Sequence, residues 1–213
     1  MLFSDARARY QAEWKPIDDV LYHLVLNHSK HDVYPDVYLK VIFIERLYRA
    51  GITRKAGFNA IIGEKNVAEA LVAMHPVLSN GLQAIAAAPN DFARFEESIV
   101  THHAVTERLA NSLNGTWLTS FVSKYLHFHV PEIPIYDGLV NTRATEYVYG
   151  AEFTRAKQQF VGHCDMEKVY AQYVARYAEI SAKVKAADPT ATAKEIDYLL
   201  LTRAAFDDLY AQR

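Results

Sequence analysis

Cysteine is nearly absent from this sequence of 213 residues, and so are long apolar runs and any excess of basic charge. Cys164 is the only cysteine, which excludes an intramolecular disulfide and suits a reducing compartment. No stretch approaches the roughly 18 apolar residues of a membrane span, and the charged N-terminal segment lacks the apolar run of a signal peptide. We therefore expect a cytoplasmic protein without membrane contact.

The balance of charge limits the class of function. The formal net charge is −2, with 23 lysines and arginines against 25 acidic residues. A large non-specific nucleic-acid surface is usually strongly basic, so the sequence disfavours one but allows a small basic face. Apolar residues make up 51% of the chain, which is enough for a substantial core and disfavours extended disorder.

Helical periodicity dominates the chain, and strand alternation, internal repeats and low-complexity segments are lacking. Apolar residues at steps of three and four predict helices near residues 17–25, 36–48, 67–74, 91–113, 166–177 and 196–200. Pro76, Asn114-Gly115 and Asp188-Pro189 predict interruptions. We expect an all-α fold over residues 1–213, compact and without a linker, either undivided or in two helical lobes with a cleft.

The segment WLTSFVSKYLHFHVPEIPIYDGLVN, residues 117–141, holds most of the side chains that suit chemistry. Thr116 is expected to cap a helix that begins at Trp117 and ends near His129. The two prolines that follow predict a short extended loop. Asp137 then stands where the N-cap of a further helix belongs, and that helix is expected to reach about residue 149.

Two faces of the predicted 117–129 helix differ in character. Leu118, Val122 and Leu126 share one face and are expected to anchor the helix in the core. Lys124 lies on the opposite face, which we expect to line a cleft with an aromatic wall. Rings suited to stacking on a base are those of Trp117, Phe121, Phe128 and Tyr136, and side chains suited to hydrogen bonds are those of Ser120, Ser123, His127 and His129. The structural alternative for the rings is core packing, which is commoner for aromatics at helical spacing.

Lys124 and Asp137 each have a chemical and a structural interpretation. Burial disfavours an ammonium group, and a neutral amine is a good nucleophile toward carbon, whereas most helical lysines simply extend to water. A carboxylate held by helix amides stays ionised at neutral pH and can stabilise a positive charge that develops on a sugar. For Asp137 this role is compatible with N-capping.

A metal or an RNase site is not indicated. His127 and His129 lie two residues apart and do not converge on a helix, and no cysteine or acidic residue stands at ligand spacing. Arg94 and His102 are too far apart for the Arg–His pair of an all-helical RNase, so we rank that class last. We expect neither a metal nor a cofactor.

Three motifs, SFVSKY (120–125), HFH (127–129) and PIYD (134–137), occur in this order. Together they resemble the signature of bacterial proteins similar to 8-oxoguanine DNA glycosylases, within the helix-hairpin-helix DNA glycosylase superfamily. Some members of that group lie among anti-phage defence genes. Superfamily enzymes flip a base out of duplex DNA and cut its N-glycosidic bond.

The resemblance implies roles for particular residues. Lys124 matches the lysine that attacks the sugar C1′, and Asp137 matches the aspartate that stabilises the cationic sugar. The implied substrate is double-stranded DNA with a damaged base or a modified base of phage DNA. The reaction either ends with base release or continues to β-elimination, in which a lysine–sugar Schiff base leads to a nicked strand.

The resemblance further implies a helix-hairpin-helix element within residues 98–141. Its turn, Asn114-Gly115-Thr116, is expected to hold a DNA phosphate through backbone amides, and Arg143 is a further candidate for the DNA backbone. A Gly-rich hairpin is typical of the family, and here only Gly115 is present. A second hypothesis is therefore a catalytically inactive protein of a defence system that binds nucleic acid or a partner protein.

Overall fold

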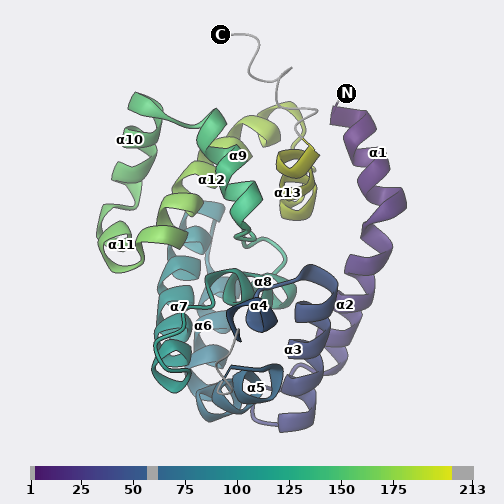
Figure 1. The fold of residues 1–213 in the computed structure, drawn as a ribbon. Coiled ribbons are helices and arrows are strands. Elements are labelled where there is room, and N and C mark those ends of the chain that lie inside the picture. The colour runs from purple at the N-terminus through teal and green to yellow at the C-terminus, as the bar shows by residue number, and fades with distance from the viewer. Residues whose placement is uncertain (1–2, 57–61, 203–213) are drawn as a thin grey trace. The chain divides into compact units, whose positions relative to one another are not determined.

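A computed structural model describes residues 3–56 and 62–202, with side chains at all of these positions except 3, 4, 55, 56, 165 and 166. Every regular element in these ranges is a helix (Figure 1), which confirms the all-α prediction. The chain divides into two compact units: a terminal unit of residues 1–19 and 131–213, and a central unit of residues 20–130. The predicted hairpin element, residues 98–141, is thus divided between the units after Val130.

Each predicted helix is present in the described residues, and the structure adds helices that were not predicted over residues 3–13, 52–56, 75–87, 150–159 and 161–166. The central unit holds most of α2 (Lys15–Asn27) and all of α3 (Tyr34–Tyr48), α4 (Ile52–Ala56), α5 (Glu64–Ala73), α6 (His75–Ala87), α7 (Asp91–Ser112) and α8 (Thr119–His129). The terminal unit holds α1 (Phe3–Glu13), α9 (Gly138–Tyr147), α10 (Gly150–Gln159), α11 (Val161–Met166), α12 (Lys168–Ala187) and α13 (Ala193–Thr202).

In the central unit, α3 packs against α5 and α8, and α6 lies beside α7 (Figure 1). The close approach of α6 and α7 depends on Gly81, because a Cβ atom there would lie 2.4 Å from Cγ2 of Thr101. Pro76 occupies the first turn of α6, where its missing N–H costs no hydrogen bond. The predicted interruption at Pro76 is confirmed, since a bend of 78° separates α5 from α6.

Among the described helices, none is long and apolar enough by itself to cross a membrane. The bent pair α5 and α6 reaches that length and composition only when the two helices are taken together. Both helices have packing partners in the central unit, α5 against α3 and α6 against α7.

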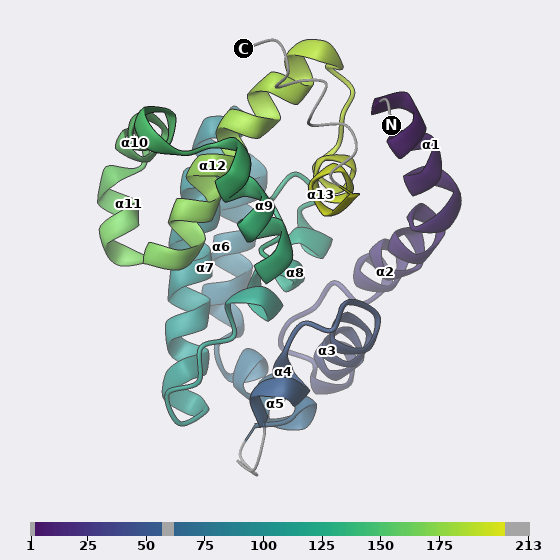
Figure 2. The same ribbon diagram turned by 45° about the horizontal axis from the view of Figure 1, so that its top comes forward.

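In the terminal unit, α12 packs against α9, α10 and α11 (Figure 2). Tyr170, Tyr173 and Tyr177 recur at steps of three and four and are fully buried, as the apolar stripe predicted. The periodicity indicated no helix over residues 150–165, where α10 and α11 lie. Both are short and mostly polar, so neither leaves an apolar stripe long enough to recognise.

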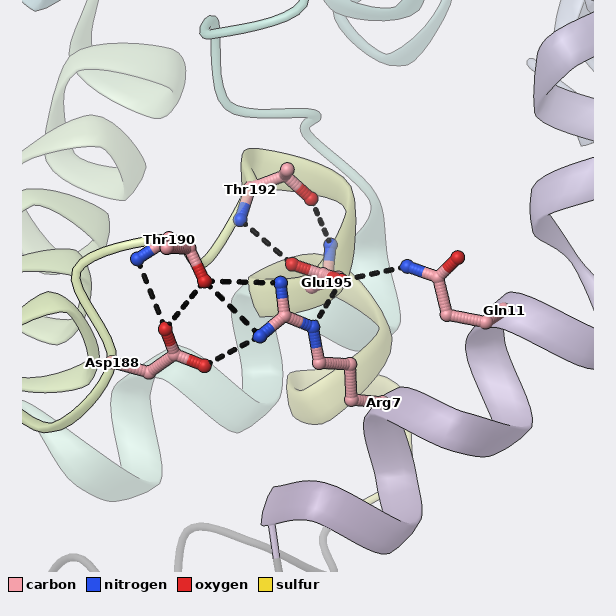
Figure 3. A network of polar contacts seen from close by, with 6 residues as sticks. All are labelled: Arg7, Gln11, Asp188, Thr190, Thr192 and Glu195. Atoms are coloured by element: carbon pink, nitrogen blue, oxygen red, sulfur yellow. Dashed lines mark hydrogen bonds and ion pairs between the residues drawn. The ribbon is translucent and has the colours of Figure 1, made fainter.

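A polar network joins α1 to the start of α13 (Figure 3). Arg7 donates to Asp188 Oδ2 at 2.6 Å and to Glu195 Oε1 at 2.8 Å, and Gln11 donates to the same Glu195 atom at 3.0 Å. Thr192 and Glu195 also form a capping box at the N-terminus of α13, with bonds of 2.9 and 3.2 Å. The N-terminal helix is thereby fixed to the C-terminal part of the chain.

Candidate functional site

Lys124 lies in the middle of α8 and is only 3% exposed. Its Nζ donates to the Ser120 hydroxyl, one turn earlier, at 2.9 Å. This contact confirms that the two residues share a face. Leu118, Val122 and Leu126 are buried as predicted, so α8 is embedded on both sides.

The start of α8 differs from the prediction. The helix begins at Thr119, and its N-cap is Leu118, which provides no side-chain cap; Thr116 is therefore not the capping residue. Asn114 and Gly115 both adopt left-handed backbone, with φ of 52° and 78°, and three non-helical residues follow before α8. Trp117 consequently lies outside the helix and is 44% exposed.

The backbone amides of the turn before α8 donate hydrogen bonds within the chain itself. The N–H of Gly115 donates to the carbonyl oxygen of Ala110 at 2.8 Å, and that of Thr116 donates to Leu113 at 3.1 Å. These bonds close the C-terminal end of α7, whose last carbonyls need donors. Both amides are therefore already bonded within the turn, and the phosphate contact predicted for them stays a prediction.

The other side chains of α8 that were predicted to contact a base have contacts within the central unit. The Phe128 ring packs 5.1 Å from that of Tyr22 and 5.0 Å from that of Tyr48, between centroids. His127 Nε2 lies 2.7 Å from the Tyr22 hydroxyl. Phe121 is fully buried, and Ser123 donates to the backbone of Ser120. These contacts are of the kind expected in a core, the structural alternative for these rings.

Asp137 is the N-cap of α9, as the sequence predicted. Its carboxylate accepts the N–H of Leu139 at 2.9 Å, and its backbone is extended. The preceding loop is fixed to α12, because the Tyr170 hydroxyl donates to the Pro134 carbonyl at 3.1 Å. The Tyr136 ring meets that of Tyr173 edge-on at 5.5 Å. Asp137 therefore stands beside a row of buried tyrosines.

Lys124 belongs to the central unit and Asp137 to the terminal unit, so the structure describes the two halves of the predicted site separately. The remaining DNA-contact candidates differ in their surroundings. Asn114 is exposed in the turn after α7. Arg143, on α9 with Asp137, forms an ion pair with Glu146 at 3.1 Å.

A second buried lysine, Lys40 of α3, did not stand out in the sequence. It is fully buried, and burial lowers its pKa to about 8. Its Nζ donates to the Lys30 carbonyl at 3.0 Å and lies 3.5 Å from His31 Nδ1 and 3.4 Å from His129 Nε2. The available signal was a single lysine in the apolar interval 36–44.

The hydrogen bonds around Lys40 fix the protonation of its neighbours. His129 Nδ1 lies 2.7 Å from the Tyr125 carbonyl and must donate to it, so its Nε2 accepts from Lys40. The Tyr125 hydroxyl, 3.1 Å from His31 Nδ1, remains protonated because burial raises its pKa. Burial lowers the pKa of His31 to about 4 and that of His129 well below its usual range. Both imidazoles are thus neutral, and the charge of the cluster rests on Lys40.

Comparison with protein-family models, with curated proteins and with solved structures finds no match to this chain. Within the described residues, no group of three or more His, Cys, Asp or Glu side chains is placed to hold a metal ion. The interpretation of the site therefore depends on its own geometry and on its motifs.

Proposed function

We propose that the chain is a DNA glycosylase of the helix-hairpin-helix type, which flips a damaged or modified base out of duplex DNA and cuts its N-glycosidic bond. The observation that carries this proposal is the burial of the Lys124 amine within the SFVSKY motif. A buried amine more readily takes the neutral form that attacks carbon than an exposed one does.

In the proposed reaction, Lys124 Nζ forms a bond to the sugar C1′ as the bond from C1′ to the base breaks. The base leaves with the bonding electron pair and takes up a proton. Opening of the sugar ring gives an imine between Lys124 and the sugar, from which β-elimination can expel the 3′ phosphate. If water attacks in place of the amine, the reaction ends with base release.

Asp137 is proposed to stabilise the positive charge that develops on the sugar as the bond breaks. Its carboxylate is held by the N–H of Leu139 and lies at the positive end of the α9 dipole. A fixed carboxylate costs no reorganisation at the moment of reaction. The proposed substrate places the protein in the cytoplasm, a setting that the single cysteine also suits.

The proposed DNA contact shifts from the turn to α8 itself. Because Leu118 supplies no side-chain cap, the first-turn amides of α8 are the proposed phosphate donors in place of those of Gly115 and Thr116. Arg143 remains a candidate for a neighbouring phosphate, in exchange for its ion pair with Glu146.

Base release from a panel of damaged and phage-modified duplexes tests the proposal. We expect Lys124→Met, which keeps the volume of the side chain, to lower the rate by roughly a thousandfold or more, the scale of losing a nucleophile. Borohydride should trap a covalent complex with the wild-type protein, and peptide mapping should place the adduct on Lys124. Thermal unfolding of the variant establishes that it is folded.

Lys40→Met is the matched control, since it removes the other buried lysine of the central unit. It is expected to retain trapping. An adduct that maps to Lys40, or trapping that survives in Lys124→Met, would contradict the assignment of the nucleophile.

A second function is favoured by the closed turn before α8, in which the Gly115 and Thr116 amides are used internally. A catalytically inactive protein that binds nucleic acid or a partner protein needs no flipped base. It would bind duplexes of the panel without base release, and Lys124→Met would leave its biological activity unchanged.

A further inference from the structure

Tyr173 of α12 carries a hydroxyl that no group in the described part of the chain bonds. The residue is fully buried, and its hydroxyl oxygen has no hydrogen-bond partner there. Nearly all buried hydroxyls in proteins are bonded, because an unmade bond destabilises the folded state. Tyr170, one turn earlier, follows this rule by donating to the Pro134 carbonyl at 3.1 Å. The Tyr173 hydroxyl therefore calls for an explanation beyond packing.

The surroundings of Tyr173 place it beside Asp137. Its ring meets that of Tyr136, the residue directly before Asp137, edge-on at 5.5 Å with an interplanar angle of 88°. Burial, and then the carboxylates of Asp197 and Asp137 among other neighbours, hold the pKa of Tyr173 well above its usual range. The phenol is thus protonated at any physiological pH, and it can donate a hydrogen bond close to Asp137.

Neighbouring buried polar groups of the terminal unit are engaged elsewhere. The Tyr10 hydroxyl donates to Asp18 at 2.7 Å, and Lys194 Nζ lies 3.5 Å from Asp18 and 3.9 Å from Asp197. These contacts form a separate chain from α1 to α13, and the Tyr173 hydroxyl is no part of it. The network around Asp18 therefore does not account for Tyr173.

We propose that Tyr173 is a substrate-binding residue of the Asp137 site, whose hydroxyl donates a hydrogen bond to an oxygen acceptor on the extruded base. The inference rests on the proposed function. A donor without a partner in the free protein gains its bond only when substrate binds, so this bond discriminates against bases that lack the acceptor. The same hydroxyl makes the free protein less stable than an unhydroxylated ring would, as is common at functional sites.

Tyr173→Phe tests the proposal, because it removes only the hydroxyl and keeps the ring contact with Tyr136. We expect its melting temperature to equal or exceed that of the wild-type protein. We expect kcat/KM for base release to fall about 10- to 100-fold, the range for losing one hydrogen bond to a polar or charged partner. The loss should be absent for a base analogue that lacks the oxygen acceptor.

Tyr170→Phe is the matched control on the same face of α12. It loses a hydrogen bond within the protein and should lower the melting temperature. A lowered melting temperature of Tyr173→Phe would overturn the proposal, because it would show a structural partner for the hydroxyl. Unchanged kcat/KM in a stable Tyr173→Phe would overturn it as well, and would leave the proposed function intact.

Failure of the proposed function has a different signature, which is the absence of base release by the wild-type protein itself. Binding to the same panel of duplexes in uncleavable 2′-fluoro form then tests Tyr173 separately. Weaker binding by Tyr173→Phe supports the contact with the base, and equal binding by the two proteins overturns it.

Discussion

Lys40 and Lys124 show two ways in which this protein accommodates a buried amine. Lys124 donates to a hydroxyl on its own helix at 2.9 Å, whereas Lys40 reaches a backbone carbonyl and two neutral imidazoles from other segments. A buried ammonium group needs acceptors for its three N–H groups, because water is excluded. At Lys40, the imidazoles provide those acceptors only while they are neutral.

This dependence makes stability sensitive to acid at His31. Burial lowers its pKa from 6.5 to about 4, so the folded state favours the neutral ring. The resulting stability is complete above pH 6.5 and is lost as the pH falls toward 4. We expect the free energy of unfolding, from urea titrations, to fall over this interval by up to about 3 kcal/mol through His31 alone.

His31→Gln keeps a hydrogen-bonding side chain beside Lys40 and Tyr125 but cannot titrate. Its free energy of unfolding should therefore vary less between pH 6.5 and 4 than that of the wild-type protein. His23→Gln is a suitable control, since His23 is an exposed histidine of α2 outside this cluster. Equal pH dependence in His31→Gln and the wild-type protein would show that His31 is not the responsible group.

At the scale of the helix, the sequence predicts what local interactions determine. Asp137 could be assigned as an N-cap because capping needs only the next few residues. The start of α8 could not, because two consecutive left-handed residues, Asn114 and Gly115, close α7 and delay the next helix. The cluster around Lys40 joins α3, the segment before it and α8, and no spacing in the sequence reports such a contact. The roles of Lys124 and Asp137 come from the motifs and stay predictions.

The N-cap of α9 allows its structural and chemical roles to be separated. Asparagine caps a helix about as well as aspartate, so Asp137→Asn should change the free energy of unfolding by only about 0.3 kcal/mol. Asp137→Ala should cost about 1 kcal/mol, because the Leu139 N–H loses its acceptor. Chemical denaturation of the two variants measures the difference.

In base release, by contrast, the two variants are expected to behave alike. Asparagine carries no charge to stabilise a cationic sugar, so Asp137→Asn should lose activity as fully as Asp137→Ala does. Full activity of Asp137→Asn would show that Asp137 is only a helix cap.

At the scale of the whole molecule, the two units differ in connectivity. The central unit is one continuous segment, residues 20–130, whereas the terminal unit combines residues 1–19 with 131–213. Arg7 joins these two segments through Asp188 and Glu195 (Figure 3). Because the Glu195 side chain is only 2% exposed, this contact is better shielded than an ordinary surface ion pair.

Arg7→Ala should therefore destabilise the terminal unit and leave the central unit unchanged. We expect a loss of about 1 kcal/mol in the free energy of unfolding, a value for a partly exposed pair. In hydrogen exchange, α1 and α13 should lose protection while α6 and α7 retain theirs. Arg46→Ala is the control, because it removes a more exposed ion pair with Glu64 in the central unit. Equal loss of protection in α6 and α7 would contradict independent behaviour of the units.

The contact of Arg7 with Asp188 and Glu195 also has a consequence for synthesis on the ribosome. The partners of Arg7 are translated about 180 residues after it. During that interval Arg7 of α1 lacks its acceptors on Asp188 and Glu195. The central unit is complete once residue 130 has left the exit tunnel and can already fold. α1 is thus synthesised long before the residues that fix it, and the terminal unit can close only after Asp188 and Glu195 have left the exit tunnel.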